Sequence, residues 1–286
     1  MEVSKIWALS FSPTGNAERI AAEIARKMSE RLQVPSECVS LNRPGARRRE
    51  YVLIPTDFLV IACPVYAGKL PNKILPDLKA VLKGNQTPAA AVVTYGNRAF
   101  DNALAELIAL LTGQGFCPVS AAACVGEHAF TDKLGGGRPG VSDLWDVRTF
   151  AARTADALRT FPACPPPVTV PGDPSAPYYV PKGADGQPVN FLKAKPKVDA
   201  SRCHACGACA RLCPMGAIDP DDVSRVPGTC IKCQACVRRC TRRARYFDDP
   251  AFLSHVSMLE RHFTEPKENA FFYATDPKIF TPVSVL

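Results

Sequence analysis

The sequence of 286 residues predicts an α/β fold: a doubly wound parallel sheet of five strands, followed by a small α+β domain. Three observations predict it. Short apolar runs alternate with helical patterns over residues 1–163, which is typical of βαβ units around a parallel sheet. A loop of hydroxyl residues and glycine joins the first apolar run to the first helical pattern. Eight cysteines fall in two matching groups between Cys203 and Cys240.

The apolar runs place five strands in the first domain, and right-handed crossovers put its helices on both faces of the sheet. The expected strands span about residues 6–10, 37–41, 58–63, 89–94 and 118–125. The expected helices span about residues 15–31, 72–82, 100–111 and 142–160.

Composition divides the chain into four segments: an α/β domain (1–164), a proline-rich linker (165–197), a cysteine-rich domain (198–247) and a tail (248–286). Because proline fixes the backbone, the linker is expected to be semi-rigid. Its Tyr178, Tyr179 and Phe191 favour packing over a neighbouring domain. The tail has a helical pattern at 252–263, and we expect it to pack on the domains.

The spacing of the eight cysteines predicts their chemistry. Both groups have the pattern Cys-x-x-Cys-x-x-Cys-x-x-x-Cys, and Pro214 follows the first group. Bacterial segments with this pattern hold two 4Fe–4S clusters, and the fourth cysteine of each group binds the other cluster. Cluster 1 is therefore assigned to Cys203, Cys206, Cys209 and Cys240, and cluster 2 to Cys213, Cys230, Cys233 and Cys236. Such clusters transfer one electron at a time, so the chain is expected to carry electrons.

Other uses of these cysteines fit the spacing less well. Structural zinc sites pair two Cys-x-x-Cys units across a longer arm. Covalent haem attachment needs histidine where Gly207 and Gln234 stand. A disulfide framework belongs to secreted chains, whereas this N-terminus lacks an apolar signal region and no apolar run approaches membrane-spanning length. We therefore expect a cytoplasmic protein without membrane insertion, in which the remaining cysteines are unpaired: Cys38, Cys63, Cys117, Cys124 and Cys164.

The two cysteine groups are copies of one pattern, in which Cys203 maps to Cys230. The second copy is strongly basic, with arginines at Arg238, Arg239, Arg242, Arg243 and Arg245. Three interpretations are open: the arginines form a solvated face, they raise the reduction potential of a nearby cluster, or they bind an acidic partner. The formal charge of +8 also suits acidic redox partners. Nucleic acid is not expected, because no recognition motif or aromatic platform accompanies the charge.

The loop after the first strand contains the second candidate site. Its sequence, Ser10-Phe-Ser-Pro-Thr-Gly-Asn-Ala-Glu18, leads directly into the first helix. Hydroxyl groups, a glycine and free N–H groups at a helix start can bind an anion, although an ordinary helix cap uses the same residue types. The position, at the switch point of a doubly wound sheet, favours a phosphate. The loop lacks the glycine patterns of triphosphate and dinucleotide sites, which favours a single phosphate such as that of FMN.

On these residues, segment 1–163 resembles a flavodoxin, and the whole chain resembles the flavodoxin–ferredoxin fusion proteins of anaerobic bacteria and archaea. The resemblance implies bound FMN. It assigns the flavin site to three loops: Ser10, Ser12, Pro13, Thr14, Gly15, Asn16 and Ala17; Pro64, Val65, Tyr66, Ala67 and Gly68; and Thr94, Tyr95, Gly96, Asn97 and Phe100. Tyr66 and Phe100 would stack on the flavin ring, although Phe100 could equally pack in the core. Ala17 departs from the family, which usually has threonine there and so gains one more hydroxyl contact with the phosphate.

A fourth segment includes His128, the one candidate for a catalytic proton donor. The leading hypothesis is an electron-transfer protein that carries electrons between two 4Fe–4S clusters and FMN. Its partners would be an acidic ferredoxin, flavodoxin or oxidoreductase. The alternative is a flavin-dependent reductase that acts on a bound small molecule. A binding module that has lost its flavin is a third possibility, suggested by Ala17.

Overall fold

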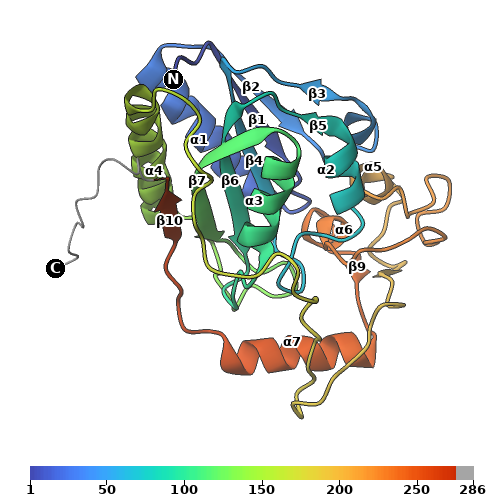
Figure 1. Cartoon of the computed structure of the whole chain (residues 1–286). Coiled ribbons are helices and arrows are strands. Elements are labelled where there is room, and N and C mark those ends of the chain that lie inside the picture. Colours follow the sequence, from blue (N-terminus) through green and yellow to red (C-terminus); the bar gives the residue numbers. More distant parts are fainter. Residues whose placement is uncertain (275–286) are drawn as a thin grey trace.

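In the computed structural model, which describes residues 1–274, a parallel sheet lies at the centre of the N-terminal domain (Figure 1). Its parallel strands follow the order β2-β1-β4-β6-β7, which is the flavodoxin-like order of a doubly wound sheet. The bounds are β1 (Lys5–Ser10), β2 (Ser36–Ser40), β4 (Asp57–Pro64), β6 (Thr87–Tyr95) and β7 (Phe116–Val125). The predicted fold class is confirmed, and each of these strands lies within a few residues of its expected place.

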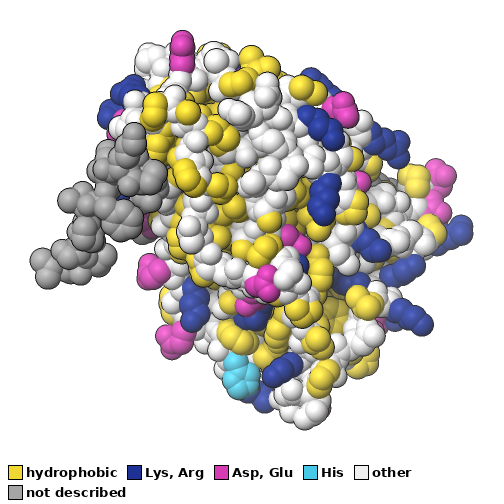
Figure 2. All heavy atoms as spheres, viewed as in Figure 1, with side chains coloured by type: hydrophobic (Ala, Val, Ile, Leu, Met, Phe, Trp, Pro, Cys, Tyr) yellow, Lys and Arg dark blue, Asp and Glu magenta, His cyan; other side chains and the backbone are white. Residues whose placement is uncertain are grey.

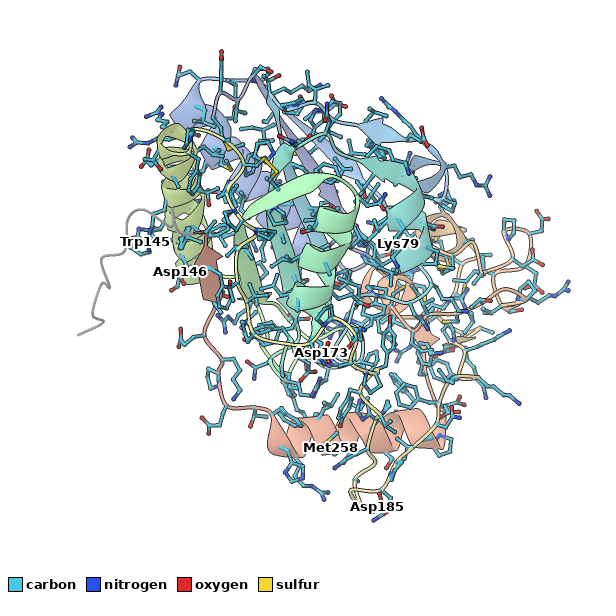
Figure 3. The ribbon with its side chains drawn as sticks, in the orientation of Figure 1. Lys79, Trp145, Asp146, Asp173, Asp185 and Met258 are labelled. Carbon is cyan, nitrogen blue, oxygen red and sulfur yellow. A yellow bond between two sulfur atoms is a disulfide. The ribbon has the colours of Figure 1, made fainter. Side chains whose placement is uncertain are left out.

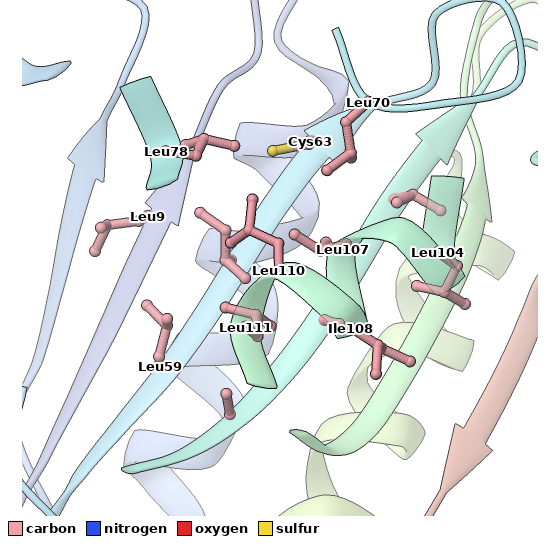
Figure 4. Packing of buried hydrophobic residues seen from close by; sticks show 14 of the residues in the cluster. Leu9, Leu59, Cys63, Leu70, Leu78, Leu104, Leu107, Ile108, Leu110 and Leu111 are labelled. Atoms are coloured by element: carbon pink, nitrogen blue, oxygen red, sulfur yellow. The ribbon is translucent and has the colours of Figure 1, made fainter. Parts of the chain in front are cut away.

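Helices cover both faces of the sheet, as the crossover rule predicts. One face packs against α1 (Asn16–Leu32) and α4 (Val141–Thr160), and the other against α2 (Leu75–Val81) and α3 (Ala103–Gly113). Figure 4 shows Leu104, Leu107 and Leu111 of α3 in the buried cluster that also contains Leu59 and Cys63 of β4. A short helix and a two-stranded ladder complete the domain: η1 (Ala46–Arg48), β3 (Tyr51–Val52) and β5 (Leu82–Lys83).

The five predicted parallel strands are all present, and in the described part of the chain a sixth, antiparallel strand that the prediction missed extends the sheet. The sixth strand, β10 (Ala270–Tyr273), comes from the tail and pairs antiparallel with β7, where Phe271 lies opposite Ala122. The side chain of Phe271 stacks on Phe150 of α4, with ring centroids 5.3 Å apart. This pairing covers the β7 edge, which would otherwise leave backbone groups unpaired. The apolar sequence of β10 has no alternation that would have identified an edge strand.

A disulfide joins Cys117 of β7 to Cys164, which corrects the prediction that both are unpaired. The linker starts by returning along the edge of β7, and the N–H of Val168 donates to the carbonyl oxygen of Pro118 at 2.9 Å. This return brings together two cysteines that lie 47 residues apart. No local pattern in the sequence indicates which thiols meet in the folded chain. Cys38, Cys63 and Cys124 are unpaired in the structure.

The cysteine-rich domain is small and has approximate internal symmetry. It contains β8 (Lys197–Val198), α5 (Ala208–Leu212), α6 (Ala235–Arg238) and β9 (Arg245–Tyr246), with β8 and β9 paired antiparallel. Backbone conformation repeats even where residue type does not. Gly216 and its counterpart Arg243 both have positive φ, at 57° and 51°. A left-handed backbone costs a non-glycine residue about 1–2 kcal/mol, so the shared geometry is imposed by the surrounding fold.

The described part of the tail that precedes β10, residues 248–269, packs between the two domains. Helix α7 (Pro250–His262) begins with Asp249, whose side chain accepts a hydrogen bond from the N–H of Phe252 at 2.9 Å. The Phe252 ring contacts Phe130 of the α/β domain, Phe191 of the linker and Phe247 of the cysteine-rich domain. One aromatic cluster therefore joins three segments that are distant in sequence. Figure 1 shows α7 below the sheet, across the end at which the parallel strands finish.

Within residues 1–274, no helix combines the length and the apolar character needed to cross a membrane.

Candidate functional site

The structure gathers the eight clustered cysteines around two cavities. One cavity is lined by Cys203, Cys206, Cys209 and Cys240, with Cys236 at its border, and we refer to it as cavity 1. The other is lined by Cys213, Cys230, Cys233 and Cys236 and is called cavity 2. In each cavity the fourth cysteine comes from the other repeat. Within the described residues, no three His, Cys, Asp or Glu side chains are placed to hold a single metal ion. The role of the eight cysteines as cluster ligands stays a prediction.

The two cavities differ in exposure. Cys206 of cavity 1 is exposed, whereas Cys233 of cavity 2 is buried. Burial raises the pKa of Cys233 and of Cys236 to about 12. Desolvation acts in the same direction on Cys240, but N–H groups that include those of Ala244 and Arg242 outweigh it and lower its pKa. Thiolates are the form that binds iron, so cavity 2 needs a cationic group to hold its sulfurs deprotonated.

A buried arginine shows that cavity 1 suits an anionic group. Arg245 is only 4% exposed, and its Nη2 donates to Cys209 Sγ at 3.2 Å. Its Nη1 is buried and has no hydrogen-bond partner. A buried cation with an unpaired donor is costly unless an anion lies beside it. A 4Fe–4S cluster with four thiolates is such an anion, so the residues of this cavity fit the group.

Of the five arginines in the second repeat, Arg245 is buried, which corrects the solvated-face interpretation for that residue, whereas Arg238 and Arg239 are exposed but reach the α/β domain. Arg245 is buried beside cavity 1. Arg238 crosses to the α/β domain, where it pairs with Glu127 at 2.8 Å and donates to the carbonyl oxygens of His128 and Ala129 at 2.6 and 2.9 Å. Arg239 lies against the predicted phosphate loop. Only the other two, Arg242 and Arg243, remain exposed without such a contact.

The predicted phosphate loop has the geometry of an anion site. No side chain caps the first turn of α1, so its N–H groups are open to an anion. Gly15 has a φ of 106°, which favours glycine, and a Cβ at this position would lie 3.2 Å from Nη2 of Arg239. The Ser12 backbone is held by Asn42, whose side-chain oxygen accepts from the Ser12 N–H at 2.8 Å. Sequence reasoning missed Asn42 and the approach of Arg239, because both come from outside the loop.

The second predicted flavin loop lies beside cavity 2. Burial raises the pKa of Tyr66 well above its ordinary value, and the neighbouring Cys233 and Cys230 act in the same direction. Ala67 adopts a left-handed backbone with φ 47°, and its carbonyl oxygen accepts from the N–H of Tyr179 at 2.8 Å. In the resembling family the carbonyl at this position turns toward the flavin, whereas here the linker holds it.

The third predicted loop is occupied largely by the tail. The Asn97 amide donates to the carbonyl oxygens of Phe263 and Glu265 at 2.6 and 2.8 Å, and the Tyr95 hydroxyl donates to that of Glu268 at 3.0 Å. Phe100 is partly buried and contacts Tyr95, with centroids 5.6 Å apart. These side chains anchor the tail over the loop, and Phe100 packs against the core as well.

His128 lies beside the third loop and is held as a neutral ring. Its Cδ2 fills the space that a Cβ on Gly96 would need. The N–H of Phe130 donates to Nδ1 of His128 at 3.1 Å. Burial, together with the nearby charges of His255 and Arg238, lowers the pKa of His128 to about 4. A ring that accepts at Nδ1 and stays neutral near pH 7 has no proton to donate as an acid other than that of Nε2.

The linker crosses the end of the sheet at which the predicted flavin loops lie, in agreement with the packing that its tyrosines favoured. Figure 3 labels Asp173 just below α3, where its N–H donates to the side chain of Asn102 at 2.9 Å. Lys69, only 6% exposed, pairs with Glu106 at 3.1 Å and donates to the carbonyl oxygens of Pro174 and Ala176. The loops predicted to hold flavin are therefore covered by linker, tail and cysteine-rich domain together.

One buried residue that the sequence analysis missed ties the domains together beside cavity 2. Arg47 of η1 is 6% exposed, and its Nη2 donates to the carbonyl oxygen of Pro214 at 2.6 Å. Its Nε donates to Asp77 at 2.8 Å. In addition, Met215 and Ile231 both line cavity 2 and pack against the core of the α/β domain. Arg47 belongs to a run of three arginines and looked like a surface residue in the sequence.

Comparison with known proteins supports the cysteine-rich part of this description. The family described as "4Fe-4S binding domain" matches residues 196–219, which contain the first cysteine group. A search of curated proteins gives no match.

Solved structures similar to the N-terminal part include flavoproteins. An archaeal flavodoxin is 13% identical, with 54% of this chain and 99% of that chain covered and a TM-score of 0.39. A flavodoxin from Streptococcus pneumoniae TIGR4 is 19% identical, with 54% and 99% covered and a TM-score of 0.37. An NADH:FMN oxidoreductase, in its apo form, is 16% identical, with 62% and 95% covered and a TM-score of 0.39. Because these scores are low, the fold rests on the strand order and crossovers of the chain itself.

Proposed function

We propose that this chain, which joins a flavodoxin-like α/β domain to a 4Fe–4S binding segment, transfers electrons between two 4Fe–4S clusters and FMN. One observation supports this most directly. The eight cysteines line two cavities, with Cys236 in both, and residues of the cavity 2 wall pack on the core of the α/β domain near Tyr66. Cluster 1 would occupy cavity 1 and cluster 2 would occupy cavity 2.

The arrangement suits a linear path for electrons. Cavity 1 lies at the exposed end, where Cys206 is accessible. Cys236 borders both cavities, so the two clusters would be neighbours. Cavity 2 shares Met215 and Ile231 with the α/β core and lies beside Tyr66. An electron entering at the surface would pass through cluster 1 and then cluster 2 to the flavin loops.

The phosphate loop of the α/β domain suits the phosphate of FMN. The open first turn of α1 and Arg239 would hold the phosphate, and Tyr66 would lie against the ring. FMN, when bound, converts between one-electron and two-electron transfer. Ala17 lacks the hydroxyl that the resembling family places there, and Arg239 offers a charged donor in compensation.

The pairing or protonation of three polar side chains near the predicted flavin loops favours electron relay over the reduction of a small molecule. Lys69 is paired with Glu106, Arg98 is paired with Asp101 and stacks 4.2 Å from the ring centre of Tyr179, and His128 is neutral. Each of these side chains is engaged by other residues of the protein and is therefore not free to bind a substrate. The structure offers no specific observation in favour of the reductase alternative.

The surface around cavity 1 suits an acidic redox partner. Figure 2 shows Lys and Arg side chains along the right-hand side of the molecule, in the region of α5 and α6. Arg211 donates to the carbonyl oxygen of Cys206 at 3.0 Å, and the exposed Arg242 lines cavity 1. Charges of one sign at an entry point accelerate encounter with an oppositely charged partner, and salt slows it.

The test is anaerobic purification with iron, sulfide and flavin measured on the same sample. We expect about eight irons per chain, from two four-iron sites, and one FMN. Cys233→Ser should lower the iron content, whereas Cys38→Ser, which changes a cysteine outside both cavities, should not. Partial reduction followed by electron paramagnetic resonance should show reduced clusters together with a flavin radical. Iron without flavin after reconstitution would favour a binding module, and zinc in excess of iron would falsify the cluster assignment.

A further inference from the structure

The internal repeat allows the two cavities to be compared position by position. Four backbone hydrogen bonds to sulfur form two matched pairs. The matched pairs are Ala205 to Cys203 and Lys232 to Cys230, at 3.4 Å each, and Ala217 to Cys213 and Ala244 to Cys240, at 3.2 and 3.3 Å. Hydrogen bonds to sulfur raise the potential of a cluster. Because these bonds match, they do not make the reduction potentials of the two clusters differ.

The side chains that line the cavities break this symmetry. At four equivalent positions cavity 2 has an apolar residue and cavity 1 a polar or charged one: Ile231 and His204, Pro214 and Thr241, Met215 and Arg242, Ile218 and Arg245. Gln234 of cavity 2 and Gly207 of cavity 1 are an exception to this pattern. Lys232, which has Ala205 as its counterpart, also places a charge near Cys230, but its ammonium group donates to the carbonyl oxygens of Leu192 and Cys230 rather than to a sulfur. On balance, cavity 1 is a polar, basic site, and cavity 2 is a mostly apolar one.

Arg245 produces the largest part of this difference. It is 4% exposed, its Nη2 donates to Cys209 Sγ at 3.2 Å, and its Nη1 is left without a partner beside cavity 1. Its counterpart Ile218 has no donor and no charge. A buried charge is screened much less by water and salt than a surface one, so its effect on a nearby cluster is strong.

Reduction adds a negative charge to a cluster, so its surroundings determine how favourable that step is. A cation and an extra hydrogen bond to sulfur stabilise the added charge, whereas apolar surroundings oppose it. We infer that the clusters are held at unequal reduction potentials, cluster 1 above cluster 2, and that Arg245 is the positioning residue that separates them. The inference rests on the proposed function, because it needs a cluster in each cavity.

The unequal potentials determine where electrons reside. The first electron taken up by the protein occupies cluster 1, at the exposed end where Cys206 lies. Cluster 2, between cluster 1 and the flavin loops, fills only at lower potential and therefore controls exchange with the flavin.

The test is an anaerobic redox titration of the complete, cluster-loaded protein, followed by electron paramagnetic resonance. Wild-type protein should show two separate one-electron steps. Arg245→Ile, which copies Ile218 into the second repeat, should lower the electron affinity of the higher step at least tenfold, or about 59 mV for a one-electron couple. Arg245→Lys keeps the charge and should restore much of the shift. The matched control is Arg243→Gly, which copies Gly216 at a position of the same left-handed conformation and should leave both steps in place.

Two coincident steps in wild-type protein, or a shift of the lower step alone in Arg245→Ile, would overturn the inference while leaving the proposed function intact. If Arg245→Ile fails to assemble clusters, Arg242→Met decides. It changes an exposed residue of cavity 1 to the residue of cavity 2, and it should lower the same step by a smaller amount. An unchanged higher step in that variant would also overturn the inference. Wild-type protein with fewer than about eight irons after reconstitution refutes the proposed function itself.

Discussion

Arg239 offers the sharpest test of the contact between the two domains. A Cβ on Gly15 would lie 3.2 Å from Arg239 Nη2, so the guanidinium reaches the loop where the flavin phosphate is proposed. Arg239→Gln removes the charge and keeps a polar, though shorter, side chain. A hydrogen bond to a charged group contributes about 1.5–3 kcal/mol, and since Arg239 is exposed we expect the lower end. The FMN dissociation constant should therefore rise about tenfold.

The assay is quenching of flavin fluorescence as flavin-free, cluster-loaded protein is titrated with FMN and, separately, with riboflavin. Riboflavin has no phosphate, so its affinity should be the same in wild type and variant. Arg243→Gln, an exposed arginine of the same repeat, is the control and should change neither affinity. Equal weakening of FMN and riboflavin by Arg239→Gln would refute the reasoning, because it would show a general disturbance of the loop.

Three further predictions concern stability. Arg47→Met leaves the carbonyl of Pro214 without its donor and should lower the free energy of unfolding by about 3 kcal/mol, measured by chemical denaturation; a loss below about 1 kcal/mol would contradict the buried geometry. Burial lowers the pKa of His128 from 6.5 to about 4, so between these values only the unfolded chain takes up the proton. The free energy of unfolding should therefore rise from pH 4 to pH 6.5, more steeply in wild type than in His128→Asn, and identical slopes would argue against a buried neutral ring. Under oxidising conditions the Cys117–Cys164 bond closes a loop of 47 residues and should stabilise the protein by about 4 kcal/mol relative to Cys164→Ser. Equal denaturation midpoints for the two proteins would show that the bond does not form.

Local sequence predicted the features that depend on short segments. The strands and helices of the α/β domain follow from apolar periodicity, which reflects the faces that a segment buries. The cysteine spacing predicted two groups of four. Three ligands of each cluster lie within a few residues of one another, and the fourth comes from the last cysteine of the other repeat. The open turn after β1 was likewise readable from Thr14, Gly15 and Asn16.

Long-range contacts could not be read in this way. The sequence left a solvated face as one of three interpretations for Arg238, and the resemblance assigned Asn97 to the flavin site. In the structure Arg238 pairs with Glu127, and the Asn97 side chain donates to the tail. The partner of a long polar side chain depends on which segment returns to that place. No pattern near the residue encodes that return.

The sequence by itself determined the class of sheet, the two sets of cysteines and the loop that can bind an anion, since each depends on residues that are near one another in the chain. Only the tertiary structure decided that Arg245 is buried beside one cavity, that Cys117 meets Cys164, and that β10 completes the sheet. The physical reason is that burial and pairing are properties of two surfaces in contact. The second surface comes from a distant part of the chain, and its arrival is fixed by packing of the whole molecule.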